Sequence, residues 1–128
     1  MYLVAGLIAA LGAYIVNRYL LKRFGENIIV FITPIVEEVL KTGLAVYLNA
    51  FILPTHLIFG IVEGIYDFKT SHFGISAGLL SIIWHTFFGL VTIILTQLMG
   101  HYVYGLIAAI LLHYIGNNIV INSKETRR

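Results

Sequence analysis

The chain contains no cysteine, which excludes disulfide bonds, cysteine-ligated zinc, iron–sulfur clusters and cysteine nucleophiles. Charge is also scarce, because charged residues make up 11% of the 128 residues, where an average soluble domain has roughly 25%. Hydrophobic residues make up 59% of the chain. A soluble domain of this size would need more polar residues to cover its surface, so the composition predicts an integral membrane protein.

Apolar runs of close to twenty residues recur along the chain with hardly a polar linker between them. They predict one all-α domain over residues 1–128, a bundle of about five transmembrane helices. The third run is the shortest, and at 1.5 Å per residue it reaches only about 21 Å, less than the roughly 30 Å hydrocarbon core. We therefore expect it to be tilted, embedded or partly re-entrant. The expected helices are Tyr2–Leu21, Ile28–Leu53, Thr55–Phe68, Phe73–Met99 and Tyr102–Ile121.

The basic residues predict the orientation of the bundle. With five spans, every Lys and Arg outside the apolar runs falls on one side, and the two opposite loops, near Pro54 and Gly100, contain neither. Cytoplasmic loops carry the excess of Lys and Arg, so we expect a multi-pass protein of the cell membrane with its N-terminus outside and its C-terminus in the cytoplasm. These basic residues are Arg18, Lys22, Arg23, Lys69, Lys124, Arg127 and Arg128.

Several polar residues interrupt the apolar runs, where each is unfavourable. A charge at a helix centre costs about 2.5 to 3.5 kcal/mol on the insertion scale. We therefore expect these side chains to face one another and not the lipid. They are Glu37, Glu38, Lys41, Glu63, Asp67, His85, His113, Asn117 and Asn118.

The depth of these residues predicts that they form one cluster. Counted from the expected cytoplasmic ends, Glu37, Glu63, His85 and His113 lie at roughly 9 to 18 Å, within about two helical turns of one another. Asn117 follows His113 by four residues, so the two share one helix face. We assign no role to the histidines at expected loops or helix ends, and we expect Asp67 to be interfacial. Those histidines are His56, His72 and His101.

The charge balance of the cluster favours a hydrolytic site. Its three glutamates face a single lysine, Lys41, which we expect to be the counter-ion of Glu37 or Glu38. A low-dielectric site does not hold three ionised carboxylates against one ammonium, so at least one glutamate is suited to taking a proton from water. Two histidines and Asn117 add hydrogen-bonding groups. A base, a water and donors aimed at an oxyanion are the parts of such a site.

Four motifs occur in order along the chain, namely EEVLK at 37–41, FGIVE at 59–63, His85 and HYIGN at 113–117. In order and spacing they resemble the PrsW branch of the intramembrane metal-independent protease superfamily. That superfamily also contains the CAAX prenyl proteases (the CPBP or ABI family) and the APH-1 subunit of gamma-secretase. The CAAX branch typically shows EExxxR and FxxxH, whereas this chain has EExxK and FxxxE, which favours the PrsW branch.

The resemblance implies that the chain hydrolyses a peptide bond of a membrane-anchored protein or peptide. Catalysis would depend on glutamate, with no metal, no other cofactor and no nucleic-acid partner. Carried over by position, Glu37 would be the base with Glu38 supporting it, and His113 with Asn117 would form the oxyanion site. Family members commonly have seven or eight spans, so five would correspond to a core without the helices that gate or recognise substrate.

Glu63 and His85 are the less certain members of the set that the resemblance implies. Glu63 stands where the CAAX enzymes have a histidine, and His85 could serve in its place. The catalytic residues expected from the resemblance are Glu37, Glu38, Glu63, His85, His113 and Asn117.

Other functions fit the residues less well. The GxSxG pattern at 74–78 lies at an expected helix entrance, without the strand and turn that expose a nucleophilic serine. Tyr66-Asp67 lacks the GxGD partner of presenilins, and there is no HExxH of a zinc protease. The main alternative is a zinc, ion or proton transporter that uses the Glu and His cluster. A third alternative is a non-catalytic scaffold of the APH-1 kind.

Overall fold

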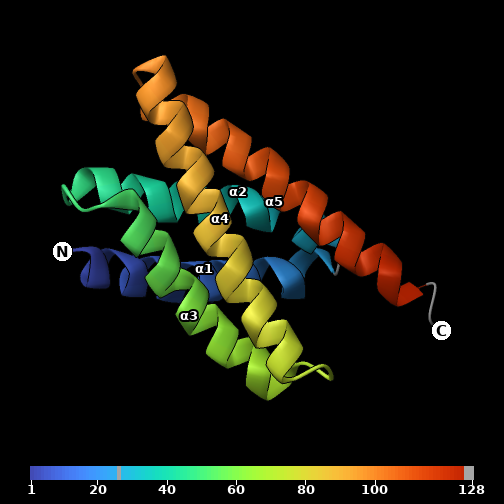
Figure 1. Cartoon of the computed structure of the whole chain (residues 1–128). Coiled ribbons are helices and arrows are strands. Elements are labelled where there is room, and N and C mark those ends of the chain that lie inside the picture. Colours follow the sequence, from blue (N-terminus) through green and yellow to red (C-terminus); the bar gives the residue numbers. More distant parts are fainter. Residues whose placement is uncertain (26, 126–128) are drawn as a thin grey trace.

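A computed structural model of the chain describes residues 1–25 and 27–125, and these residues contain helices and no strands. This confirms the all-α class (Figure 1). Three helices are long and apolar enough to cross a membrane, namely α1, α4 and the stretch Tyr102–Val120 of α5. The five helices are α1 (Tyr2–Phe24), α2 (Asn27–Tyr47), α3 (Ile52–Thr70), α4 (Ile75–Met99) and α5 (Tyr102–Glu125).

The boundary between α2 and α3 differs from the expected one. Helix α2 ends at Tyr47, six residues before the expected end at Leu53, because the backbone turns at Asn49, whose φ is 49°. Pro54 lies inside the first turn of α3, where a helix does not need the missing N–H. Helix α3 therefore has 19 residues and is about 28 Å long, close to the thickness of the hydrocarbon core.

The helices close into a ring. Helix α1 packs on α2 and α3, α3 packs on α4, α4 on α5, and α5 returns to α2. Helix α2 also contacts α3, and in Figure 1 α3 and α4 cross α1 and α2 obliquely. Residues on the inner face of each helix therefore point into a shared interior.

Glycines let the helix backbones of this ring approach closely. A Cβ atom built on Gly64 of α3 would lie 2.7 Å from the carbonyl oxygen of Gly78 on α4. A Cβ on Gly105 of α5 would collide with the backbone of Thr92 on α4. Small residues also let α1 approach its neighbours closely. The buried face of this helix consists of four alanines and one glycine, namely Ala5, Gly6, Ala9, Ala10 and Ala13. Side chains as small as these bring whole helices into van der Waals contact.

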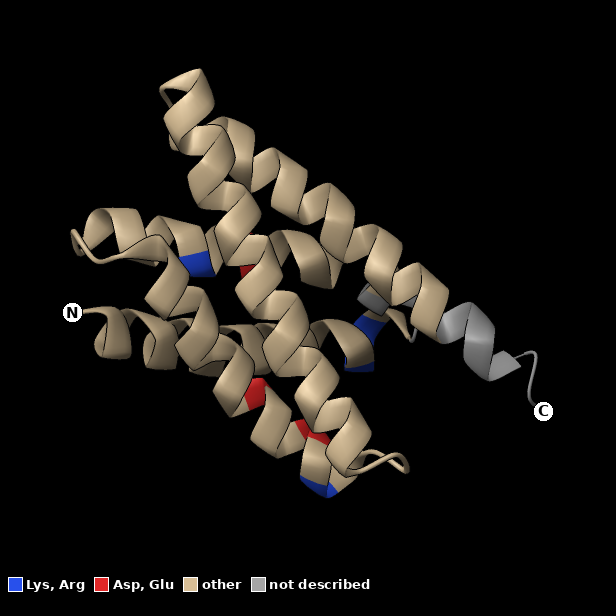
Figure 2. Ribbon diagram, in the orientation of Figure 1, with Lys and Arg blue, Asp and Glu red and all other residues tan. Residues whose placement is uncertain are grey.

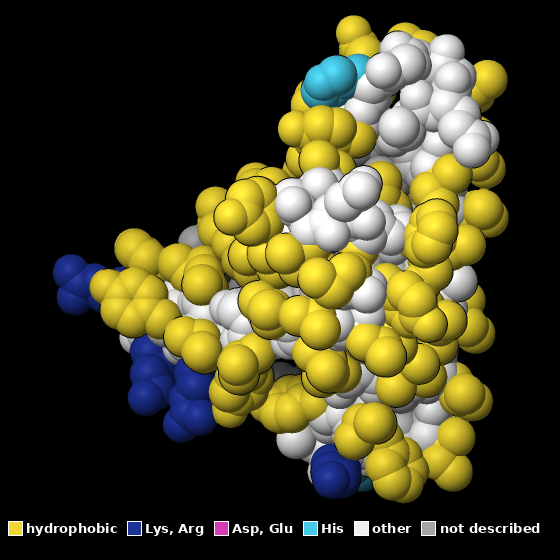
Figure 3. All heavy atoms as spheres, turned by 90° about the vertical axis from the view of Figure 1, so that its left-hand side faces the viewer, with side chains coloured by type: hydrophobic (Ala, Val, Ile, Leu, Met, Phe, Trp, Pro, Cys, Tyr) yellow, Lys and Arg dark blue, Asp and Glu magenta, His cyan; other side chains and the backbone are white. Residues whose placement is uncertain are grey.

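The outside of the ring is apolar. Large hydrophobic side chains such as Leu11, Ile83 and Ile119 are more than half exposed, and hydrophobic atoms cover most of the face in Figure 3. In Figure 1 the N-terminus and the α2–α3 connection lie at the left and the α4–α5 connection lies at the top, whereas α1 ends right of centre, α3 ends at the bottom and α5 ends at the lower right. The basic residues near the ends of α1 and α3 thus lie on the same side of the bundle (Figure 2).

Candidate active site

The polar residues of four helices meet inside the ring. Glu37, Glu38 and Lys41 come from α2, and each is at most 4% exposed. Helices α4 and α5 contribute His85 and His113, whose ring centroids are 5.3 Å apart. Glu37, His85 and His113 each offer one oxygen or nitrogen atom that could ligate a metal ion, and these three atoms lie within 4.8 Å of one another. The single cluster expected from residue depth is therefore present, since Glu63 of α3 also joins it by bonding His85.

Glu38 and Lys41 form a buried ion pair at the centre of the cluster. The Lys41 ammonium lies 2.6 Å from Glu38 Oε1 and 4.4 Å from the centre of the Phe59 ring. His113 Nδ1 lies 3.0 Å from the same carboxylate oxygen. An ionised carboxylate only accepts hydrogen bonds, so Nδ1 of His113 carries a proton and donates a hydrogen bond to Glu38. Lys41 is thus the counter-ion of Glu38, one of the two partners expected for it.

His85 connects this ion pair to Glu63. The Lys41 ammonium lies 2.7 Å from His85 Nδ1, and an ammonium has only donors, so Nδ1 accepts. The other ring nitrogen, Nε2, then carries the proton and donates a hydrogen bond to Glu63 Oε2. Ser81 donates a second hydrogen bond to Glu63, at 2.9 Å. Both nitrogens of His85 therefore have partners, while the Glu63 side chain remains 31% exposed.

Glu37 has fewer partners than Glu38. Its Oε1 accepts a hydrogen bond of 2.8 Å from the side-chain amide of Asn17 on α1. Its Oε2 is buried and has no hydrogen-bond partner among the described residues. The nearest ring nitrogen that faces it is Nε2 of His113, at 3.7 Å. Because His113 already donates through Nδ1, its Nε2 is an acceptor whenever the ring is neutral. Glu37 Oε2 is therefore the carboxylate oxygen of the cluster that keeps an unused hydrogen-bonding capacity among the described residues.

His56 belongs to the site although it was expected at the end of a helix and without a role. Because α3 begins at Ile52, His56 falls in the second turn of the helix and is fully buried. Its Nε2 lies 3.2 Å from the hydroxyl of Thr42, and its Nδ1 lies 3.7 Å from Glu38 Oε2. Thr42 follows Glu38 by four residues, so helical spacing placed it on the same face. Asn17 and Ser81 were also missed. Ser81 precedes His85 by four residues, so helical spacing placed it on the same face, whereas Asn17 lies beside Arg18 near the end of the first apolar run.

The remaining polar residues lie farther from the centre. Asn117 is half-buried one turn beyond His113, and Asp67 is half-buried near the end of α3. His72 and His101 are exposed. The structure thus gives these two histidines no place in the cluster.

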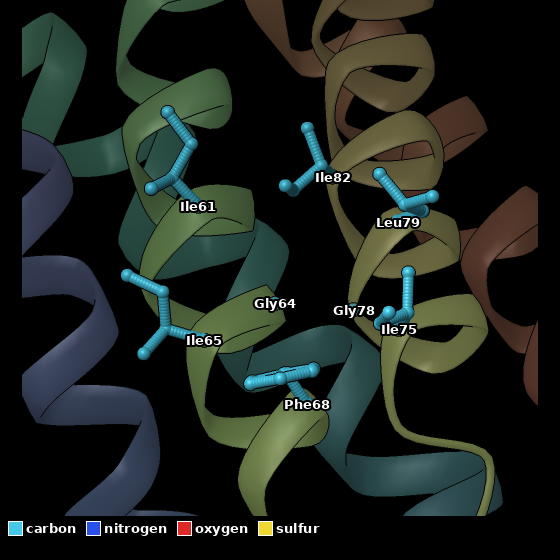
Figure 4. Close-up of a pocket in the computed structure, with 8 residues that line it drawn as sticks. All are labelled: Ile61, Gly64, Ile65, Phe68, Ile75, Gly78, Leu79 and Ile82. Atoms are coloured by element: carbon cyan, nitrogen blue, oxygen red, sulfur yellow. The ribbon is translucent and has the colours of Figure 1, made fainter.

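Two hollows in the surface of the described residues lie away from this cluster. An apolar groove runs between α3 and α4, lined by Ile61, Gly64, Ile65, Phe68, Ile75, Gly78, Leu79 and Ile82 (Figure 4). A second hollow lies between the start of α3 and the end of α4, near Phe51 and Gln97. Neither contains a member of the polar cluster, so neither is a cavity of the candidate active site.

Comparisons with protein-family models, curated proteins and solved structures find no match to this chain. The likeness to the PrsW branch therefore rests on the motif residues alone.

Proposed function

We propose that this protein is an intramembrane peptidase in which Glu37 activates water to hydrolyse a peptide bond of a membrane-associated protein or peptide. The observation that carries the proposal is the buried Glu37 Oε2, which has no partner among the described residues and faces His113 Nε2 at 3.7 Å. A carboxylate oxygen in this setting is suited to accept a proton from a water. The water would attack the carbonyl carbon of the substrate while Glu37 takes its proton.

The neighbouring groups support this role of Glu37. Glu38 is ionised against Lys41 and holds His113 through Nδ1, so it orients the imidazole without taking part in proton transfer. As an imidazolium, His113 would carry a proton on both ring nitrogens. Its Nδ1 would still donate to Glu38, and its Nε2 would donate to the oxyanion together with Asn117, which lies on the same face of α5. The leaving amine would then take the proton from Glu37.

We assign Glu63 and His85 to the support of this site. His85 spans from Lys41 to Glu63, and its two nitrogens are both engaged, so neither is directed at a substrate. Glu63 is the most exposed acid of the set, and its position on α3 places it on the side of the bundle with the basic helix ends. By the positive-inside rule this side faces the cytoplasm, with the N-terminus outside the cell membrane.

A zinc or ion transporter is the second candidate, because Glu37, His85 and His113 could together ligate a metal ion. Two observations disfavour it. Both nitrogens of His85 already have partners, and a metal ion would sit beside the Lys41 ammonium, which lies 2.7 Å from His85. Like charges at such distances repel strongly in a low-dielectric interior. The donor set therefore fits a water better than a cation.

The test is to incubate the purified protein in liposomes with a library of membrane-anchored peptides and to analyse the products by mass spectrometry. We expect cleavage that survives chelators and disappears in Glu37→Gln and in His113→Ala. His72→Ala, which removes an exposed histidine, is the matched control and should cleave normally. Cleavage lost with chelators, or stoichiometric metal lost in Glu37→Gln, would support the transporter or a metal mechanism. Full biological activity in both site variants would support a scaffold.

A further inference from the structure

Helix α1 contributes to the cluster through one side chain, Asn17. Ala13, one turn earlier, is 2% exposed against the bundle and brings α1 close to its neighbours. Asn17 is half-buried, and its Nδ2 donates to Glu37 Oε1 at 2.8 Å, a link between residues 20 positions apart. The motifs that suggested a peptidase begin at residue 37, so they assign nothing to this helix.

The remaining polar atoms of this pair have no protein partners. Asn17 Oδ1 and Glu37 Oε2 are both buried, and neither has a hydrogen-bond partner in the part of the chain that the structure describes. The donor of this bond is the amide nitrogen of Asn17, which leaves Oδ1 as an acceptor. Buried acceptors are nearly always satisfied by protein or by water. A water that lay between these two acceptors would donate one hydrogen bond to each of them.

We propose that Asn17 is a positioning residue for the attacking water: its Nδ2 donates to Glu37 and orients that side chain, and its Oδ1 accepts a hydrogen bond from the O–H of the water that does not react with Glu37. This inference rests on the proposed peptidase function. Two directional hydrogen bonds fix the water, so its lone pair points at the substrate carbonyl carbon. Without Asn17 the water and the carboxylate would both be free to rotate.

The chemical step balances with these groups alone. One O–H bond of the water breaks as its proton moves to Glu37 Oε2, and the other O–H remains hydrogen-bonded to Asn17 Oδ1. The water oxygen forms the new C–O bond, and the π pair of the carbonyl moves onto its oxygen. On collapse of this intermediate the C–N bond breaks, and the amine takes the proton from Glu37. Glu37 is a carboxylate again at the end of the reaction.

His113 is the rival acceptor for the second proton of the water. Its Nε2 lies 3.7 Å from Glu37 Oε2 and is unprotonated when the ring is neutral. The test must therefore separate Asn17 from His113.

The kinetic test uses Asn17→Leu, which is similar in size and lacks both polar atoms, in liposomes with a cleaved peptide. We expect kcat to fall about 10- to 100-fold, as for the loss of an orienting contact, with KM changed by less than about twofold. Tyr14→Phe is the matched control on α1, because it removes one hydrogen bond, that from Arg18 to the Tyr14 hydroxyl, and should leave both constants unchanged. Asn17→Ser provides the measurement if the leucine variant does not fold.

Infrared difference spectra supply a readout that does not depend on cleavage. The Glu37 carboxylate band, identified by its loss in Glu37→Gln, should shift in Asn17→Leu and stay unchanged in Tyr14→Phe. An internal-water band, identified by its shift in ¹⁸O-water, should disappear in Asn17→Leu.

Two results would overturn the inference while leaving the peptidase intact: an unchanged kcat in Asn17→Leu, or a water band that only His113→Ala removes. If the wild-type protein cleaves no peptide, the peptidase proposal fails. The infrared bands then still decide whether Asn17 binds a water beside Glu37.

Discussion

Glu37 and Glu38 are adjacent in the chain, yet they lie in different surroundings. Glu38 has an ammonium at 2.6 Å, an imidazole at 3.0 Å and no exposed surface. Glu37 has one amide donor from α1 and a second oxygen without a described partner. Successive residues on a helix point about 100° apart, so one carboxylate meets Lys41 and α5 while the other turns toward α1. One acid is therefore fully paired inside the bundle, and the other keeps a buried oxygen without a described partner.

The largest expected effect is on the Glu38 side. Lys41→Met leaves the buried Glu38 carboxylate without its ammonium and should lower the free energy of unfolding by about 3 to 5 kcal/mol. Titration of the protein with a denaturing detergent, followed by circular dichroism, measures this loss. The double variant Lys41→Met with Glu38→Gln removes both charges and should recover much of it. A single variant as stable as the wild type would mean that Glu38 is not the structural acid.

The opposite pattern is expected on the Glu37 side. Glu37→Gln should lower kcat at least about 100-fold, because general-base catalysis contributes factors of that size. The free energy of unfolding should change by less than about 1 kcal/mol, since the amide oxygen of the new side chain can still accept from Asn17. Both quantities are measured on one preparation in liposomes or micelles. Equal losses of stability in Glu37→Gln and Lys41→Met would remove the distinction between the two acids.

A change in the packing of α5 on α4 should lower the stability of the protein and its cleavage activity together. Gly105→Ala places a Cβ against the backbone of Thr92, which pushes α5 away from α4 and moves His113 relative to His85. Overpacking of this kind should destabilise the protein by about 1 to 3 kcal/mol and reduce cleavage in parallel. Gly43→Ala on α2 is the control, because its Cβ would meet nothing within 4 Å. If stability falls and kcat does not, the alignment of α4 with α5 is not needed by the site.

The smallest expected effect comes from the contact between Thr42 and His56, beside Glu38. Thr42→Val removes the hydroxyl that lies 3.2 Å from His56 Nε2 and should lower the free energy of unfolding by about 1 kcal/mol, with kcat changed by less than about twofold. Thr86→Val is the matched control, because the Thr86 hydroxyl bonds only a carbonyl of its own helix. A large loss of kcat in Thr42→Val would place His56 in the reaction and not only in the support of Glu38.

Much of the fold could be predicted from local patterns, and the errors have local causes. The apolar runs located all five helices, but the α2–α3 boundary was wrong because Pro54 was read as a loop residue when it lies in the first turn of a helix. The same error removed His56 from the candidate residues. Asn17 was missed because it lies beside Arg18 near a helix end, where a polar residue gives no sign of facing inward.

The sequence by itself determined the run of apolar helices, three of which are long and apolar enough to cross a membrane, and it predicted that the acids and histidines meet, because isolated charges are too unfavourable in an apolar interior to be left apart. Only the tertiary structure decided the pairing. Lys41 is within reach of both Glu37 and Glu38 by helical spacing, and its pairing with Glu38 depends on where α4 and α5 lie. Helical periodicity defines which residues share a face, but the crossing of the five helices, set by contacts between glycines and alanines, defines which faces meet.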